Sequence, residues 1–317
     1  MEPKDHQVWL EVALNGGWGR KLQPLIPVRV RDLIAEGIAC VRAGAAIVHF
    51  HAYDEDSELP SDDAGLYAAV IEGIRAEVDA IVYPTIAFEG HDRYAFVETL
   101  ARRGLLEWAA LDTGSVNLSR FADVAAGRPG GIYSNDERGM RRGLALASEY
   151  GFHPSYACYE PGFIRLGAAL HRALPDAPQP IYRLMFSNGL AFGFPPQRYA
   201  LEAYRSLLAV EAPEAPAMIA GLDVDLSFIS EAALAAGMHL RVGLEDAPLG
   251  SQVGNVELVE AAAATMSRRL ATAAGIRRAL DSRQCRSDRA RGLAQECASP
   301  AGRRSREKPS APKKINI

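Results

Sequence analysis

Short runs of apolar and β-branched residues alternate along this chain with longer stretches whose apolar residues recur at helical spacing. Runs of the first kind are typical of buried strands, and stretches of the second kind predict amphipathic helices. Eight strands are expected, at Val8–Leu14, Ala45–His51, Ala80–Thr85, Ala109–Asn117, Ser155–Glu160, Ile181–Ser187, Ala217–Leu222 and Leu240–Glu245.

An amphipathic stretch follows each expected strand. The expected helices are Val30–Ala43, Asp62–Glu77, Asp92–Arg103, Ser134–Tyr150, Gly162–Leu174, Gln197–Val210, Ser227–Ala236 and Asn255–Ala273. Gly104 and Gly151 come directly after two of them, where glycine commonly ends a helix. A strand followed by a helix, repeated eight times, predicts an α/β fold whose parallel strands close into a (β/α)8 TIM barrel, one domain over residues 1–280.

Composition adds one boundary and excludes several classes of protein. Residues 281–317 are rich in Arg, Lys, Ser and Pro without apolar periodicity, so we expect a disordered basic tail there. A net charge of -4 gives no basic stripe for nucleic acid. The four cysteines are scattered, no apolar leader opens the chain, and no apolar run approaches the roughly 18 residues of a membrane helix. A cytoplasmic enzyme is therefore expected.

Polar residues gather where the expected strands end. In a TIM barrel the carboxyl ends of the strands form the face that carries the active site. We therefore expect a substrate to be bound by residues at these ends, namely Asn15, Thr85, Ser115, Asn117 and Glu160.

The sharpest signal is the pair of histidines in His49-Phe50-His51. Residues two apart on a strand point to the same side, so both imidazoles can reach one metal ion. Glu245 ends the eighth strand, which barrel closure places beside the first, within reach of the second. Two histidines and a carboxylate with an open position are typical of catalytic zinc, and iron or manganese accept the same ligands. The alternative is a hydrogen-bonded histidine pair packed at the barrel mouth.

Two neighbours of Glu245 need separate interpretation. Arg241 lies four residues earlier, more than about 10 Å away along an extended strand, so a direct ion pair with Glu245 is not expected. Asp246 follows Glu245 directly, and spacing alone leaves it open whether it is a general base near the metal or a loop carboxylate.

Five segments in order resemble the family of β-keto acid cleavage enzymes, of which the 3-keto-5-aminohexanoate cleavage enzyme is the named member. These segments are Leu14–Gly16, Ala43–His51, Asp112–Asn117, Tyr159–Gly162 and Gly237–Asp246, and the last of them is the most specific. The resemblance implies a homotetramer of (β/α)8 barrels in which His49, His51 and Glu245 hold zinc. It also implies the reaction: the residue at Asp246 removes a proton from a β-keto acid, the carbanion attacks acetyl-CoA, and acetoacetate and a new acyl-CoA are released.

The chain departs from the family around the substrate. Val224 stands where some members have an arginine, and Trp18, Tyr53 and Pro84 replace polar residues of some members. Three interpretations therefore stay open. The first is a β-keto acid cleavage enzyme with an altered substrate shell, and the second is a metal-dependent barrel aldolase or hydrolase that does not use acetyl-CoA. A descendant that binds metal or a small acid without turnover is a third.

Overall fold

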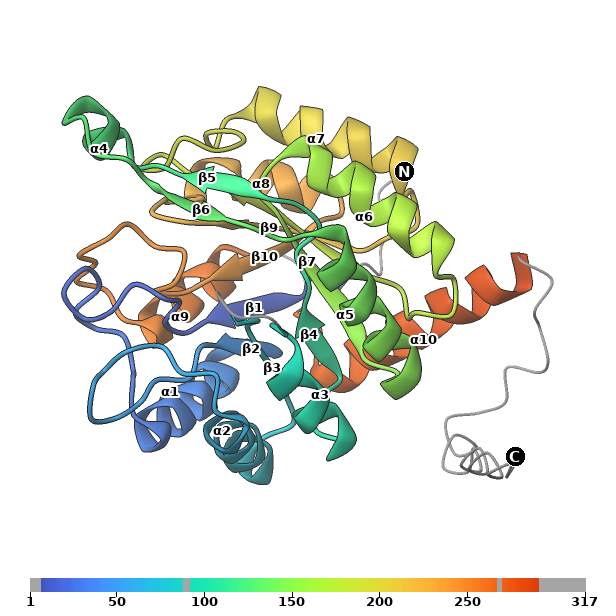
Figure 1. Cartoon of the computed structure of the whole chain (residues 1–317), viewed down its shortest axis with the longest axis horizontal. Helices are drawn as coiled ribbons and strands as arrows, with labels where there is room; N and C mark the ends of the chain where they lie inside the picture. The colour runs from blue at the N-terminus through green and yellow to red at the C-terminus, as the bar shows by residue number, and fades with distance from the viewer. Residues whose placement is uncertain (1–6, 88–91, 267–269, 291–317) are drawn as a thin grey trace, which may run out of the picture.

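Eight parallel strands form the centre of the protein in a computed structural model that describes residues 7–87, 92–266 and 270–290 (Figure 1). The strands follow the order β3-β2-β1-β10-β9-β8-β7-β4, and the edge strands β3 and β4 approach within 8 Å of each other. The sheet therefore closes into a barrel, which confirms the expected fold. The strand bounds are β1 Leu10–Ala13, β2 Ile47–Phe50, β3 Ile81–Pro84, β4 Trp108–Ala110, β7 His153–Cys158, β8 Ile181–Phe186, β9 Ala217–Gly221 and β10 His239–Val242.

Helices surround the barrel (Figure 1). Eight of them begin close to the positions expected from the sequence, and the last of these ends at Thr265, whereas the expected helix extended to Ala273. Their bounds are α1 Val30–Ala43, α2 Ala64–Glu77, α3 Ala95–Arg102, α5 Glu137–Tyr150, α6 Pro161–Ala173, α7 Arg198–Glu211, α8 Ser227–Ala235 and α9 Asn255–Thr265. None of the helices in the described ranges is long and apolar enough to span a membrane.

A further helix, α10 (Ala273–Ala290), closes the amino-terminal end of the barrel. Its residues Ile276 and Leu280 pack with Trp9 and Trp108, which begin or precede barrel strands. The helix continues past residue 280, where the composition predicts the start of a tail. The rest of that predicted tail, residues 291–317, lies outside the described residues.

The expected fourth strand, Ala109–Asn117, is wrong as one element. The strand β4 ends at Ala110, and the chain turns at Asp112 and Thr113, whose side chains bond to Ala157 N and Phe163 O. The following segment forms an antiparallel hairpin of β5 (Val116–Leu118) and β6 (Gly131–Tyr133), with the short helix α4 (Phe121–Ala125) between them. Both pieces are rich in apolar residues, so the sequence pattern merged them.

The barrel interior changes character from one end to the other. At the amino-terminal end it is filled by apolar side chains, including Trp9, Ile47, Ile81, Trp108 and Met218. Because residues two apart on a strand point to the same side, the next inward-facing side chains lie two residues further along each strand. The residues found there form what we call the inner polar layer: Glu11, His49, Tyr83, Ser155, Arg183 and Arg241.

Candidate metal centre

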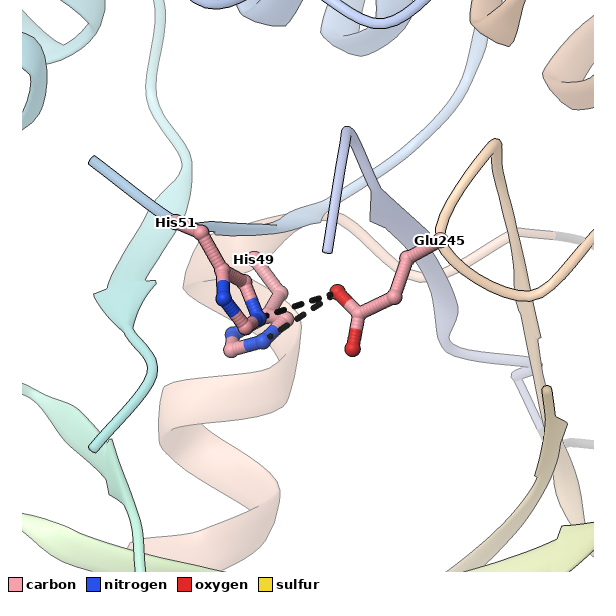
Figure 2. A group of neighbouring side chains, drawn as sticks. All are labelled: His49, His51 and Glu245. Atoms are coloured by element: carbon pink, nitrogen blue, oxygen red, sulfur yellow. Dashed lines mark ion pairs between the residues drawn. The ribbon is translucent and has the colours of Figure 1, made fainter. Parts of the chain in front are cut away.

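His49 at the end of β2, His51 directly after that strand and Glu245 in the turn after β10 meet at the carboxyl end of the barrel. The Nε2 atoms of His49 and His51 lie 3.4 and 3.6 Å from the same oxygen of Glu245, Oε2 (Figure 2). The potential ligand atoms of all three side chains lie within 4.8 Å of one another. The arrangement expected from the sequence is therefore present in the geometry.

These distances suit a metal better than a hydrogen-bonded cluster. Zinc bonds of about 2.0–2.2 Å to nitrogen and oxygen in a tetrahedron place neighbouring ligand atoms about 3.3–3.6 Å apart. Hydrogen bonds between nitrogen and oxygen centre near 2.9–3.0 Å. In addition, the buried Oε2 of Glu245 has no hydrogen-bond partner among the described residues, as expected for an acceptor that faces a cation. The donor set fits a divalent metal.

A turn immediately after β10 carries Glu245 back over the barrel. Gly243 has φ 129°, and its carbonyl oxygen accepts hydrogen bonds from Asp246 N and Ala247 N. A Cβ at Gly243 would lie only 2.2 Å from the Ala13 carbonyl oxygen, so glycine is required both by the backbone angle and by the close approach to β1.

This turn makes the expected separation of Arg241 and Glu245 wrong. The guanidinium Nη2 of Arg241 lies 2.9 Å from Oε1 of Glu245. The sequence argument assumed an extended strand up to Glu245, whereas β10 stops at Val242 and the chain then folds back. Arg241 thus holds one carboxylate oxygen while the other faces the histidines, which fixes the orientation of the Glu245 carboxylate.

Electrostatics keep His49 and Glu245 in the protonation states that a metal needs. Burial lowers the pKa of His49 well below its ordinary value, despite the opposing charge of Glu245, so its imidazole is neutral. Burial alone would raise the pKa of Glu245, but Arg241, His49 and His51 outweigh it and hold that pKa well below its usual range. Glu245 is therefore a carboxylate at neutral pH.

Asp246 is buried and tightly held. Its Oδ1 accepts hydrogen bonds from Nε and Nη2 of Arg241 at 3.0 and 2.5 Å, and its Oδ2 accepts one from Gly221 N at 3.0 Å. Burial raises the pKa of Asp246, although Arg241 opposes this effect. The side chain is thus both fixed in place and more basic than an ordinary aspartate.

Asn15, one of the expected substrate contacts, uses its side-chain amide to hold the backbone around the histidines. Its amide Nδ2 donates to the carbonyl oxygens of Pro27 and His51, and its Oδ1 accepts from His51 N, each at 2.9 Å. With both amide protons donated to backbone oxygens, Asn15 ties the first loop to the backbone of His51. Its position therefore indicates that it orients a histidine.

Two of the residues that depart from the family pattern, Trp18 and Tyr53, also fix the loop after β1. Trp18 donates from its indole nitrogen to the Glu245 carbonyl oxygen at 2.7 Å, and the Tyr53 hydroxyl donates to the Gly16 carbonyl oxygen at 2.7 Å. These aromatic residues connect the first loop, the turn after β2 and the turn after β10. Val224, in place of an arginine, is buried, and its backbone N–H donates to the Asp246 carbonyl oxygen.

The remaining expected substrate contacts fall in three places. Ser115 and Asn117 are exposed and belong to the start of the β5–β6 hairpin, so their expected place at the end of the fourth barrel strand is wrong; Asp112 occupies it. Thr85 is half-buried directly after β3. Glu160 follows β7, accepts a hydrogen bond from Gly193 N at 3.0 Å, and lines a cavity of about 550 Å³ with Ser187 and Phe192.

The sequence argument missed four members of the inner polar layer that surrounds His49, namely Glu11, Tyr83, Ser155 and Arg183. Tyr83 donates from its hydroxyl to Glu11 at 2.7 Å, and its ring lies 4.6 Å from the ring of His49. Burial raises the pKa of Glu11, with Arg241 opposing. These residues lie within strongly apolar strands, and only strict alternation from the histidines would have marked them.

Comparison with known proteins identifies the family. A sequence profile of the β-keto acid cleavage enzyme family matches residues 7–281 of this chain. The chain belongs to the β-keto acid cleavage enzymes. This membership confirms the resemblance inferred from the five sequence segments, and the matched region covers the barrel and the first part of α10.

Individual relatives within the β-keto acid cleavage family are distant. The 3-oxoadipate:acetyl-CoA acetyltransferase of Cupriavidus necator is 29% identical over 242 residues, which are 75% of this chain and 79% of that enzyme. The 3-keto-5-aminohexanoate cleavage enzyme of Fusobacterium nucleatum is 27% identical over 143 residues, 44% of this chain and 48% of that enzyme. The apo structure of ObcA has a TM-score of 0.64 at 17% identity and covers 80% of this chain and 65% of that chain, a likeness in fold.

Proposed function

We propose that this chain is a metal-dependent β-keto acid cleavage enzyme that converts a β-keto acid and acetyl-CoA into acetoacetate and a new acyl-CoA. The observation that carries the proposal is Glu245 Oε2, which has no hydrogen-bond partner among the described residues and faces the Nε2 atoms of His49 and His51 at metal-ligand spacing. Membership of the family and the acetyl-CoA-dependent reaction named for the C. necator relative support the choice of reaction.

His49, His51 and Glu245 would hold the metal, and zinc is our first choice because two histidines, one carboxylate and an open position suit catalytic zinc. A metal bound there supplies Lewis-acid polarisation of the substrate carbonyl and stabilises the negative charge of its enolate. Arg241 orients the Glu245 carboxylate for this task through its 2.9 Å contact.

We propose Asp246 as the base that removes the proton between the ketone and the carboxylate of the substrate. Its raised pKa makes it a stronger base than an ordinary aspartate, and Arg241 and Gly221 N hold it next to Glu245. The resulting carbanion attacks the acetyl thioester, CoA leaves as the thiolate, and this thiolate then attacks the original ketone. This second step forms the new acyl-CoA and breaks the bond between the ketone carbon and the α-carbon. The acetoacetate carbanion that leaves takes back the proton held by Asp246.

Thr85 and Glu160 remain our proposals for substrate contacts, since both lie at the carboxyl ends of barrel strands. A cytoplasmic homotetramer is proposed from the family resemblance. Exposed apolar side chains on the hairpin and α4, Phe121, Val124 and Ile132, favour association of several copies.

A second candidate is a metal-dependent aldolase or hydrolase that uses the same ligands without acetyl-CoA. The observation in its favour is Val224, a buried apolar residue where some family members have an arginine. An enolate site without that cation loses charge stabilisation that is often worth a few kcal/mol.

An isotope experiment separates the two candidates. Acetyl-CoA labelled with ¹³C in both acetyl carbons is incubated with the zinc-loaded protein and a β-keto acid, and the products are analysed by mass spectrometry. We expect both labelled carbons in acetoacetate and none in the new acyl-CoA, because the acetyl group is transferred to the carbanion. Cleavage products that carry no label would favour the aldolase or hydrolase instead.

A further inference from the structure

We propose that Arg183 and Ser155 form a subsite inside the barrel that binds a second acidic group of the substrate, so that dicarboxylic β-keto acids are preferred. This inference rests on the proposed function and adds the class of substrate to it. It concerns the inner polar layer, across the barrel from His49, because Arg183 belongs to β8, four strands away from β2 in the barrel order, and Ser155 belongs to the neighbouring strand β7.

Arg183 is a buried cation whose hydrogen-bonding capacity is incompletely used. The side chain is 3% exposed, and its Nη2 donates to the Ser155 carbonyl oxygen at 3.1 Å. Its Nε has no hydrogen-bond partner among the described residues. A buried N–H of a guanidinium is costly to leave without an acceptor, so an oxygen atom is expected beside it.

Ser155 adds a second unsatisfied donor at the same place. Its hydroxyl is fully buried and has no partner in the part of the chain that the structure describes, while its backbone oxygen already contacts Arg183. A serine hydroxyl and a guanidinium N–H side by side form a suitable pair for one carboxylate, which has two acceptor oxygens.

The charge around Arg183 differs from that around Arg241. Arg241 lies 2.9 and 2.5 Å from the carboxylates of Glu245 and Asp246 and is therefore compensated. Arg183 has its nearest carboxylate, Asp112, at 3.8 Å, and the oxygens of Asp112 already accept from Ala157 N and the Tyr133 hydroxyl. Arg183 is thus the cation in this layer that an incoming anion would best complement.

The subsite is close enough to the metal centre for one small molecule to reach both. The ring of Tyr83 lies 4.6 Å from the ring of His49 and 5.9 Å from the guanidinium carbon of Arg183. The inward positions of the neighbouring strands carry small side chains, Ala110, Ala157 and Ala220, in place of the bulky residues that usually fill a barrel. A few methylene groups would connect a β-keto acid at the histidines to a carboxylate at Arg183.

Two matched pairs of acids test the subsite. Kinetics with acetyl-CoA compare 3-oxoadipate with 3-oxohexanoate, which carries a methyl group in place of the second carboxylate. Calorimetric titration of the zinc-loaded protein compares adipate with hexanoate, and this comparison needs no turnover. The variants are Arg183→Gln and Ser155→Ala, and Arg205→Gln, on the outer helix α7 with an exposed partner Glu202, is the matched control.

We expect Arg183→Gln to lower kcat/KM for 3-oxoadipate by about 10- to 150-fold, the usual effect of a hydrogen bond to a charged group. The value for 3-oxohexanoate should change by less than about threefold, and Arg205→Gln should change neither. Ser155→Ala should give the same selectivity with a smaller effect, about 2- to 10-fold. If Arg183→Gln does not fold, Ser155→Ala carries the test, since it removes one atom and no charge.

The outcomes separate this inference from the proposed function. If the wild-type protein turns over both keto acids, and Arg183→Gln and Ser155→Ala each change kcat/KM equally for the two, the subsite is overturned and the proposed function is left intact. Absence of turnover together with tighter binding of adipate than of hexanoate, lost in Arg183→Gln, would overturn the proposed function and support the subsite. Equal binding of adipate and hexanoate by the wild-type protein would also overturn the subsite.

Discussion

Replacing Arg241 with methionine tests the role assigned to the cation at the centre of the site. The guanidinium is fully buried and contacts three carboxylates: Asp246 at 2.5 Å, Glu245 at 2.9 Å and Glu11 at 3.5 Å. Methionine fills part of the volume but leaves these carboxylates without their shared cation. Breaking a buried ion pair in this way costs about 3–5 kcal/mol.

That loss is large enough to measure by two independent methods. For a domain of this approximate size, each kcal/mol lowers the melting temperature by about 2–4 °C, so the metal-free variant should melt about 6–20 °C lower. Urea denaturation should show the same loss as a lower midpoint with little change in slope. The deficit should be smaller at pH 5 than at pH 8, because protonation of the uncompensated carboxylates relieves part of the cost.

Two further variants show whether loss of the positive charge causes the lower stability of Arg241→Met. Arg277→Met removes a guanidinium that contacts two carboxylates, those of Asp79 and Glu107, from a partly exposed position on α10, and should cost no more than about 1 kcal/mol. The double variant Arg241→Met with Asp246→Asn should recover part of the stability, because the amide carries no charge. A single Arg241→Met variant within 1 kcal/mol of the wild type would refute the electrostatic reasoning.

Three other predictions concern the metal ligands, the base and pH. His49→Ala and His51→Ala should each lose the metal, measured by elemental analysis, because each removes one of three protein ligands, whereas His171→Ala on α6 should retain it; full occupancy in the first two variants would contradict the ligand assignment. Asp246→Asn should keep the metal but lose exchange of the substrate α-proton with deuterated water, measured by NMR without acetyl-CoA, and normal exchange would exclude Asp246 as the base. The folded-state pKa of His49 is lowered, so below about pH 6.5 the unfolded chain binds a proton that the folded protein does not. Stability of the metal-free protein should therefore fall as the pH decreases from there, by up to about 1.4 kcal/mol per pH unit, and His49→Gln should lack this contribution; identical pH profiles would contradict it.

The barrel was predictable because its signals are local and repeated. Seven of the eight barrel strands, the start of the fourth and the starts of eight surrounding helices follow from apolar spacing. The convergence of His49 and His51 on one side follows from alternation along β2 and the residue after it. Helix α10 was missed as a separate element because its polar, basic second half resembles a tail. Its packing on Trp9 and Trp108 depends on residues far away in the sequence.

The inner parts of the site depend on three-dimensional details that no spacing rule contains. The contact between Arg241 and Glu245 exists because the chain reverses at Gly243, one residue after β10 ends. Arg183 is a single cation within the apolar run Ile181–Ser187, and its unsatisfied Nε becomes apparent only when its neighbours are known. Sequence therefore located the three residues of the candidate metal centre, whereas the contact that orients Glu245 and the subsite proposed at Arg183 depend on the fold.

Acetoacetate formation by the zinc-loaded protein, measured with acetyl-CoA and a panel of β-keto acids, with and without a chelator, tests the central claim most directly. Our account predicts that acetoacetate appears only when acetyl-CoA, a β-keto acid and the metal are all present, and that zinc restores the activity removed by the chelator. Formation of acetoacetate that is unchanged by complete removal of the metal, or cleavage of the keto acid without acetyl-CoA, would contradict it.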